Sequence, residues 1–359
     1  MFYPPERTTL DLYFINKPNL DRLVKSLSKI YNIFAPVKSG NNRFYKKVGD
    51  EGLEGATIGE IRTVEPIKSF YFPARARIAE YFSKENSNKS EKPFAIMGAK
   101  SCDLVSFKVM DYVYAQEPFR DPFYMSKREK HLIISSDCTC YGETCFCVAI
   151  GIMPYPAEGF DINLSEVEGG YVAECDSLKG EQILKEYFKL FQAAEPYIGK
   201  REANRKRLKE DLLGHVKKSR IPQKDSIQKA FKSKFDSGLW EETAKTCVEC
   251  GACNMICPAC HCFILMDQKK DNGFEKLRMW DSCLLMHFAR VAGGANPRKF
   301  LGQRLRNRFD KKFNFFPDTI GKFGCTGCGR CTEACPGKID IREVLSKLGV
   351  NSQTSHTRL

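Results

Sequence analysis

Eight of the seventeen cysteines in this 359-residue chain fall into two copies of one spacing, C-x2-C-x2-C-x3-C-P. The copies are Cys247, Cys250, Cys253, Cys257 with Pro258, and Cys325, Cys328, Cys331, Cys335 with Pro336. The three clustered thiolates of such a run can hold one face of a [4Fe–4S] cubane, and the fourth typically ligates the other cluster of a pair. The repeat therefore predicts two [4Fe–4S] clusters.

Crossed ligation assigns to each cluster three cysteines from one copy and the last cysteine of the other copy. The first cluster would be held by Cys247, Cys250, Cys253 and Cys335, and the second by Cys325, Cys328, Cys331 and Cys257. The alternative for a cysteine-rich segment is zinc, but structural zinc sites use two separated cysteine pairs around one ion. Three crowded cysteines followed by a fourth with proline, twice over, favour clusters over zinc.

Four further cysteines follow two predicted strands in the N-terminal half. Cys102 comes after the apolar run 94–98, and Cys138, Cys145 and Cys147 come after the run 131–135. Ligand sites of α/β sheets gather at the carboxyl ends of strands, so parallel neighbouring strands would bring these thiols together. The pattern predicts a third [4Fe–4S] site, with ordinary buried thiols as the alternative. Cys140 lies two residues from Cys138 and could replace it.

The remaining cysteines have no complete ligand pattern. Cys260, Cys262 and Cys283 lie close to the first motif, where they could tune a cluster from around its ligands or help hold another cofactor. Three thiols do not complete a cubane, so we expect packing around a cluster rather than ligation. Cys175 stands alone and is most simply a thiol of the protein core.

Length and composition limit the class of protein. The chain is long enough for two domains that each bury a core. It starts without a basic segment followed by an apolar one, and no apolar run approaches the ~20 residues that span a bilayer. Many cysteines without an export signal favour cluster chemistry in a reducing compartment over disulfides. We therefore expect a cytoplasmic protein without a membrane span.

The net charge of +13 is concentrated in one polar segment. Residues 200–235 hold 13 Lys and Arg against 4 Asp and Glu. A solvated helix or linker is the favoured interpretation, and a docking face for an acidic partner comes next. Nucleic-acid binding comes last, because no recognition motif accompanies the charge.

The elements that must position these cysteines are mixed. Apolar periodicity predicts helices over 20–30, 104–114 and 183–191, strands over 94–98, 131–135 and 171–174, and an exposed loop over 83–93. Helical periodicity over 277–291 places the clusters among helices rather than in a small β framework. The predicted fold class is an α/β N-terminal domain followed by a mainly helical ferredoxin-like domain that carries two [4Fe–4S] clusters.

The predicted domain boundaries follow from these patterns. Residues 1–195 form the α/β domain with the third cluster site, and 196–238 form a basic connector. Residues 239–348 form the helical dicluster domain, and 349–359 form a flexible tail.

Taken together, these motifs resemble those of one protein family. The chain resembles the β subunits of cytoplasmic sulfhydrogenase-type [NiFe] hydrogenases and the A subunit of anaerobic sulfite reductase, from about residue 30 to 345. The matching segments are Phe34-Ala-Pro36, Ala99-Lys-Ser-Cys-Asp103, Cys138 with Cys145-Phe-Cys147, Cys247-Val-Glu-Cys-Gly-Ala-Cys253, Cys257-Pro-Ala-Cys-His-Cys262, Trp280-Asp-Ser-Cys283, Ala292-Gly-Gly294 and Cys325-Thr-Gly-Cys-Gly-Arg-Cys331. Cys140 and the long basic segment depart from the family pattern.

The resemblance implies an electron-transfer subunit of anaerobic metabolism that is not catalytic on its own. It would pass electrons between a flavin subunit that oxidises NAD(P)H, or a ferredoxin, and a terminal catalytic subunit. That terminal subunit could be a nickel hydrogenase, a sirohaem sulfite reductase or a heterodisulfide reductase. The resemblance also favours a third cluster at Cys102, Cys138, Cys145 and Cys147.

The chain's own residues leave two other functions open. No G-x-G-x-x-G follows a predicted strand, and no complete nickel or sirohaem ligand set is visible, so electrons must enter and leave through partners. The first alternative makes the chain itself a reductase, with Cys260, Cys262 and Cys283 framing an active site. The second is an iron–sulfur protein that binds nucleic acid.

Overall fold

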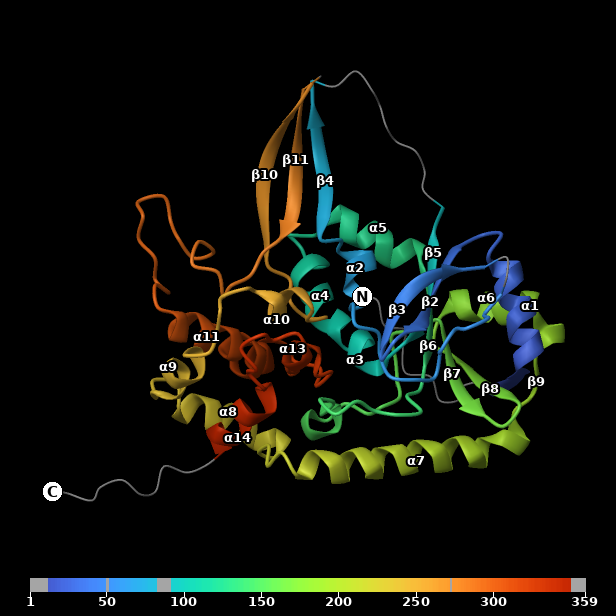
Figure 1. The fold of residues 1–359 in the computed structure, drawn as a ribbon. Coiled ribbons are helices and arrows are strands. Elements are labelled where there is room, and N and C mark those ends of the chain that lie inside the picture. The colour runs from blue at the N-terminus through green and yellow to red at the C-terminus, as the bar shows by residue number, and fades with distance from the viewer. Residues whose placement is uncertain (1–11, 50–51, 83–91, 272, 350–359) are drawn as a thin grey trace.

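The computed structural model describes residues 12–49, 52–82, 92–271 and 273–349. Figure 1 shows a large sheet built by the N-terminal half, a group of helices built by the C-terminal third, and a narrow sheet that projects between them. The predicted loop over 83–93 lies almost entirely outside the described residues, as does the predicted tail after Gly349.

The large sheet has eight strands in the order β3-β2-β5-β6-β7-β8-β1-β9. β2, β5, β6 and β7 pair in parallel, whereas the outer pairings are antiparallel. The strands are β1 (Leu12–Asn16), β2 (Asn32–Ser39), β3 (Asn42–Val48), β5 (Phe94–Ala99), β6 (Leu132–Ser136), β7 (Ile162–Val167), β8 (Gly170–Cys175) and β9 (Gln192–Ala193). β5 and β6 are continuous apolar runs because parallel strands are covered on both faces. The mixed α/β prediction is confirmed.

Helices cover the sheet and complete its two cores. α1 (Lys17–Leu27) begins where the Asn16 side chain accepts from the Asn19 N–H, and its apolar residues join one core. α3 (Ser101–Leu104) and α4 (Ser106–Tyr114) bury the predicted face of Leu104, Phe107 and Met110 in a second core. The other helices here are α2 (Lys68–Tyr71), α5 (Pro122–Lys130) and α6 (Leu178–Glu186).

The helix predicted over 183–191 lies five residues too far along the chain, because α6 spans Leu178–Glu186. α6 ends at Glu186, and a short 3-10 turn (Phe188–Leu190) follows. The chain must straighten there because Gln192 and Ala193 pair with β1. The helical spacing of apolar residues continues beyond Glu186, although the pairing of β9 with β1 requires the helix to end before it.

The basic segment forms a 23-residue helix, α7 (Glu195–Lys217), which contacts β7 and β8 and extends toward the C-terminal helices (Figure 1). The prediction of a solvated helix is correct for one side of α7 only. Its other side is buried, at Arg201, Leu208, Leu212 and Val216. α7 therefore packs along the sheet as well as presenting charge to solvent.

The C-terminal third is built mainly from helices. They are α8 (Lys224–Ser233), α9 (Leu239–Ala244), α10 (Ala252–Met255), α11 (Leu301–Asp310), a π-helical turn (Lys311–Phe315), α12 (Phe316–Ile320), α13 (Arg330–Glu333) and α14 (Ile341–Gly349). Trp240, Phe309 and Phe313 lie in their common core, and that core also contains Phe146 and Ile150 from the N-terminal half. The two halves are joined by shared packing.

The prediction of a helix over 277–291 is wrong. Gly273–Trp280 is strand β11, paired with β10 (Phe263–Lys270) and with β4 (Arg75–Tyr81) in the projecting three-stranded sheet (Figure 1). Residues 281–300 form turns. Leu277 and Trp280 fit a helical period, but pairing with β4, which lies far away in sequence, decided the local structure. Within the described ranges, every helix is too short or too polar to cross a bilayer.

Candidate iron–sulfur site

The first group of thiols surrounds one cavity. Its wall includes all four cysteines predicted for the first cluster, namely Cys247, Cys250, Cys253 and Cys335. Leu284, Leu305 and Phe309 supply apolar walls. The sulfurs influence one another: burial is the main cause that raises the pKa of Cys253 to about 11, and the neighbouring thiols of Cys331, Cys247 and Cys335 contribute to this rise. The structure thus brings the last cysteine of the second motif to the first motif.

The second group lies deeper and has the reciprocal composition. Burial raises the pKa of Cys325 to about 12, and the nearby thiols of Cys331 and Cys257 act in the same direction. Burial likewise raises the pKa of Cys331, to which Cys328 and Cys257 add. Cys257 therefore lies with the second motif, which is the arrangement that crossed ligation requires.

The two motifs use the same local geometry to aim their thiols. Gly251 and Gly329 precede α10 and α13 with φ values of 70° and 73°, a conformation that favours glycine. After the second motif, the Ile339 N–H donates to Cys335 Sγ over 3.3 Å. Such donors stabilise the anionic sulfur of a cluster ligand.

The thiols of each described group are spaced around a volume and do not converge on the position of a single metal ion. Across the described residues, no three or more His, Cys, Asp or Glu side chains converge where they could hold a single metal ion. A cubane binds its four cysteines at four different iron atoms, so its ligands lie around a volume.

The third group forms where two parallel strands end. β5 and β6 pair in parallel, with Ala95 opposite Leu132 and Met97 opposite Ile134. Cys102 follows β5 directly and Cys138 follows β6, as the sequence predicted. Burial raises the pKa of Cys138 to about 12, and Cys145 adds to the effect. Burial also raises the pKa of Cys147, with Cys138 and Cys145 next in influence.

Cys140 differs from the other thiols in this region. Its side chain is exposed, whereas Cys147 is buried and Cys102, Cys138 and Cys145 are largely covered. The exposure of Cys140 supports Cys138 as the thiol that belongs to the group.

The second and third groups are in direct contact. The Phe146 N–H donates to the Gly327 carbonyl over 2.8 Å, which places the Cys145–Cys147 segment against the second motif. A Cβ on Gly327 would lie 2.4 Å from the Cα of Cys147, so only glycine permits this approach. Cys328 accordingly influences the pKa values of both Cys102 and Cys147, behind the larger effect of burial.

Two buried lysines of the described residues, Lys100 and Lys312, lie beside the thiols and donate to no carboxylate. The Lys100 ammonium donates to the carbonyls of Ile58 and Asp137 and to the Ser136 hydroxyl, all neutral oxygens. The Lys312 ammonium donates to Cys257 Sγ at 3.2 Å and to the Gly324 carbonyl. A buried cation is costly unless negative charge lies nearby. The anionic charge of thiolate-ligated clusters would supply it, so these residues fit the predicted groups.

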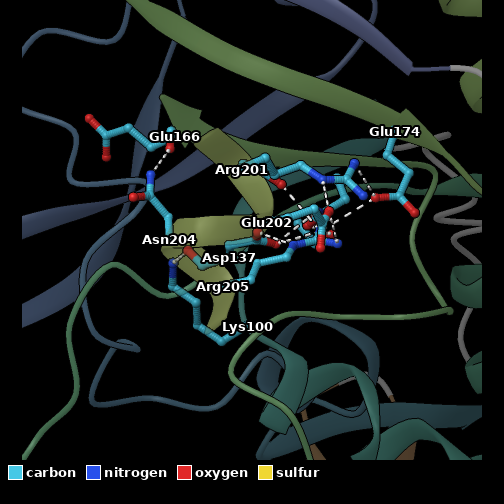
Figure 2. Close-up of polar contacts among 11 residues, drawn as sticks. Lys100, Asp137, Glu166, Glu174, Arg201, Glu202, Asn204 and Arg205 are labelled. Carbon is cyan, nitrogen blue, oxygen red and sulfur yellow. Dashed lines mark hydrogen bonds and ion pairs between the residues drawn. The ribbon is translucent and has the colours of Figure 1, made fainter. Parts of the chain in front are cut away.

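Two arginines that the sequence pattern does not single out fix the turn before Cys138. Figure 2 shows Arg201 and Arg205 of α7 pointing inward toward Asp137 and Glu174. Arg205 donates to both carboxylate oxygens of Asp137, at 2.7 and 3.1 Å, and Arg201 pairs with Glu174 at 3.2 Å. Both arginines were counted as part of a solvated charge run. Their four-residue spacing puts them on one helix face, but nothing in the sequence shows that this face meets acidic residues.

Asn254 contacts the thiols of Cys260 and Cys283, and Cys262 hydrogen-bonds Cys283. The Asn254 amide donates to Cys283 Sγ at 3.2 Å, and the Cys260 thiol donates to Asn254 Oδ1 at 3.6 Å. Cys260 also hydrogen-bonds Cys257, which lowers the pKa of Cys257. Cys260 therefore touches a predicted cluster ligand, whereas Cys175 lies apart in the core of the sheet.

Comparisons with known proteins identify a dicluster domain in the C-terminal part of the chain. Residues 246–339 match the family model described as a 4Fe-4S dicluster domain, a domain that holds two [4Fe–4S] clusters. The chain is 30% identical to sulfhydrogenase 2 subunit beta of Pyrococcus furiosus over 325 residues. The matched region covers 90% of this chain and 93% of that protein. No solved structure matches the chain.

Proposed function

Because the chain belongs to the sulfhydrogenase β-subunit family and is an iron–sulfur electron-transfer subunit, we propose that it is the internal relay of a multi-subunit oxidoreductase. It would take electrons from a flavin subunit that oxidises NAD(P)H, or from a ferredoxin. It would pass them to a terminal catalytic subunit of the hydrogenase or sulfite reductase type. A heterodisulfide reductase is the alternative terminal partner.

The observation that carries this proposal is the series of three adjoining thiol groups. Cys250 of the first group is exposed, Cys257, Cys325 and Cys328 of the second group are buried, and the third group adjoins the exposed Cys140. A [4Fe–4S] cluster accepts and releases single electrons at a potential set by charge, hydrogen bonds and exposure. A path with both ends near the surface and a buried middle suits electron passage between two partners.

We assign three ligand sets on the geometry described above. The first cluster is held by Cys247, Cys250, Cys253 and Cys335, the second by Cys325, Cys328, Cys331 and Cys257, and a third by Cys102, Cys138, Cys145 and Cys147. The chain's other residues hold these thiols in place, exclude water and set the local charge. Lys100 and Lys312 lie where positive charge would favour the reduced state of a neighbouring cluster.

The proposal is tested with anaerobically reconstituted full-length chain. Its clusters should be reduced by reduced methyl viologen and reoxidised by an added electron acceptor, as followed by visible absorbance and low-temperature EPR. The chain alone should turn over neither hydrogen, NAD(P)H nor sulfite. Turnover of any of these by the isolated chain would instead support the catalytic alternative.

The terminal reaction is tested by the enzyme complex itself. Purification of the tagged chain from its own organism should recover a flavin subunit together with a nickel, sirohaem or heterodisulfide reductase subunit. Recovery of the cluster-loaded chain with no redox partner would contradict the relay.

A further inference from the structure

Two thiols outside all three proposed ligand sets face each other at the base of the projecting sheet. Cys262 immediately precedes β10, and Cys283 lies just beyond the end of β11. The pairing of β10 with β11 holds the two segments together, and the Asp281 N–H donates to the Cys262 carbonyl over 3.0 Å. The Cys262 thiol donates a hydrogen bond to the Cys283 sulfur.

The surroundings favour negative charge on Cys283. The Asn254 amide donates to its sulfur at 3.2 Å, and the Arg308 guanidinium donates to Asn254 Oδ1 at 2.8 Å. The hydrogen bond from Cys262 lowers the pKa of Cys283 to about 6, with help from Asn254 and Arg308. A thiolate in contact with a thiol is the reactive arrangement from which disulfides form and break.

The pair is also connected to the second group of cluster ligands. Asn254 touches Cys283 with its amide nitrogen and Cys260 with its amide oxygen. Cys260 in turn hydrogen-bonds Cys257, and the Lys312 ammonium touches both of their sulfurs. A short chain of polar contacts therefore joins the pair to a proposed ligand of the second cluster.

A route for protons leads from the pair to the surface. The buried carboxylate of Asp281 influences Cys262 and lies 3.1 Å from the Nε2 atom of His287. The side chain of His287 is 57% exposed, so it can exchange protons with water.

We propose that Cys262 and Cys283 are a redox-active dithiol that exchanges two electrons with the clusters. On oxidation a bond forms between the Cys283 thiolate and the Cys262 sulfur, the S–H bond of Cys262 is lost, and its proton leaves through Asp281 and His287. The two electrons reduce two oxidised clusters, one electron each, and the reverse steps restore the dithiol. The pair would thereby store two electrons beside carriers that move one. This inference rests on the proposed relay for its electron acceptors.

The test uses full-length, cluster-loaded protein under anaerobic conditions. One sample is reduced with dithionite and the other oxidised with thionin, and both are quenched in acid with N-ethylmaleimide before peptide mass spectrometry. We expect both thiols to be alkylated in the reduced sample and joined in one disulfide-linked peptide pair in the oxidised sample. Cys262→Ser should abolish the linked pair, whereas Cys175→Ser in the sheet core should retain it, and iron content should match wild type in both.

Two outcomes would overturn the dithiol. One is complete alkylation of both thiols in the oxidised sample while the cluster EPR signals are intact. Another is loss of iron from Cys262→Ser, which would make the pair metal ligands. If Cys262→Ser fails to fold, Cys283→Ser gives the same readout, and the wild-type comparison needs no variant. Wild-type protein without iron or EPR signals would overturn the relay and, with it, the electron acceptor of the pair.

Discussion

The dicluster region, residues 246–339, and the edge of the large sheet gather cysteines in opposite ways. In the dicluster region, each triplet is close in sequence, and Cys257 and Cys335 each lie with the opposite triplet. At the sheet edge, Cys102 and Cys138 belong to different strand ends and meet because β5 and β6 pair in parallel. A local motif specifies its ligands by spacing, whereas a group assembled by a sheet depends on every contact that holds the strands and turns.

The two regions also differ in how they are supported. The sheet-edge group relies on Arg205 and Lys100 to hold the turn at Asp137, and on Gly327 to admit the Cys145–Cys147 segment. The dicluster cysteines are positioned by short helices that belong to the motifs themselves. We therefore expect remote substitutions to damage the third group more readily than the first.

The largest effect should come from the crossed ligand. Cys335→Ala should damage the cluster held by Cys247, Cys250 and Cys253, with a loss of up to about four iron atoms per chain. Iron analysis and EPR after dithionite measure it, and Cys175→Ala serves as the control with full iron. Damage confined to the cluster of Cys325, Cys328 and Cys331 would contradict crossed ligation.

The third group is tested by the contrast between Cys145 and Cys140. Fully reconstituted wild type should contain about twelve iron atoms per chain, and Cys145→Ala about eight. Cys140→Ala should keep the wild-type content, because its exposed thiol lies at the margin of the group. About eight iron atoms in wild type would end the proposal of a third cluster.

The contact of α7 with the sheet edge should contribute strongly to the free energy of unfolding. Arg205→Gln leaves the buried Asp137 carboxylate without its charge partner, which should cost about 3 kcal/mol. The free energy of unfolding in denaturant measures this, with Lys206→Gln on the exposed side of the same helix as control. Equal stability of the two variants would show that α7 does not hold this turn.

The contact between the two regions is tested by a pair of glycines. Gly327→Ala and Gly321→Ala place alanine at nearly the same φ, 64° and 65°. Only the first would press its Cβ onto the backbone of Cys147, because nothing lies within 4 Å of a Cβ at Gly321. Gly327→Ala should therefore unfold at lower denaturant, by about 1–3 kcal/mol more than Gly321→Ala. Indistinguishable unfolding midpoints would refute the close approach.

The smallest effect should be a change of potential without loss of fold. Lys312→Met removes a buried positive charge beside Cys257 and should lower the potential of the second cluster on the order of 100 mV. Lys311→Met changes an exposed neighbour and should shift it far less. EPR-monitored redox titration compares them, and equal potentials would show that Lys312 does not act on the cluster.

A comparison of the predicted and observed helices and strands shows where sequence patterns are enough to predict local structure. The runs 94–98 and 131–135 are strands as predicted, because fully buried parallel strands need continuous apolar residues. Residues 277–291 mislead because Leu277 and Trp280 fit a helical period, whereas pairing with β4 made the chain a strand up to Trp280, with turns after it. Arg201 and Arg205 were missed for a related reason, since a charged residue does not reveal whether its helix face meets water or carboxylates.

The sequence by itself determined the cluster chemistry, because cubane ligation by a local cysteine triplet depends on a few consecutive residues and needs no knowledge of distant contacts. The spacing also supplied the predicted exchange of Cys257 and Cys335 between the two motifs. Only the tertiary structure decided that Cys102, Cys138, Cys145 and Cys147 lie against the second motif, that buried lysines and arginines face the thiols, and that Cys262 meets Cys283. Those neighbours are set by strand pairing and core packing between residues far apart in the chain, which no local pattern records.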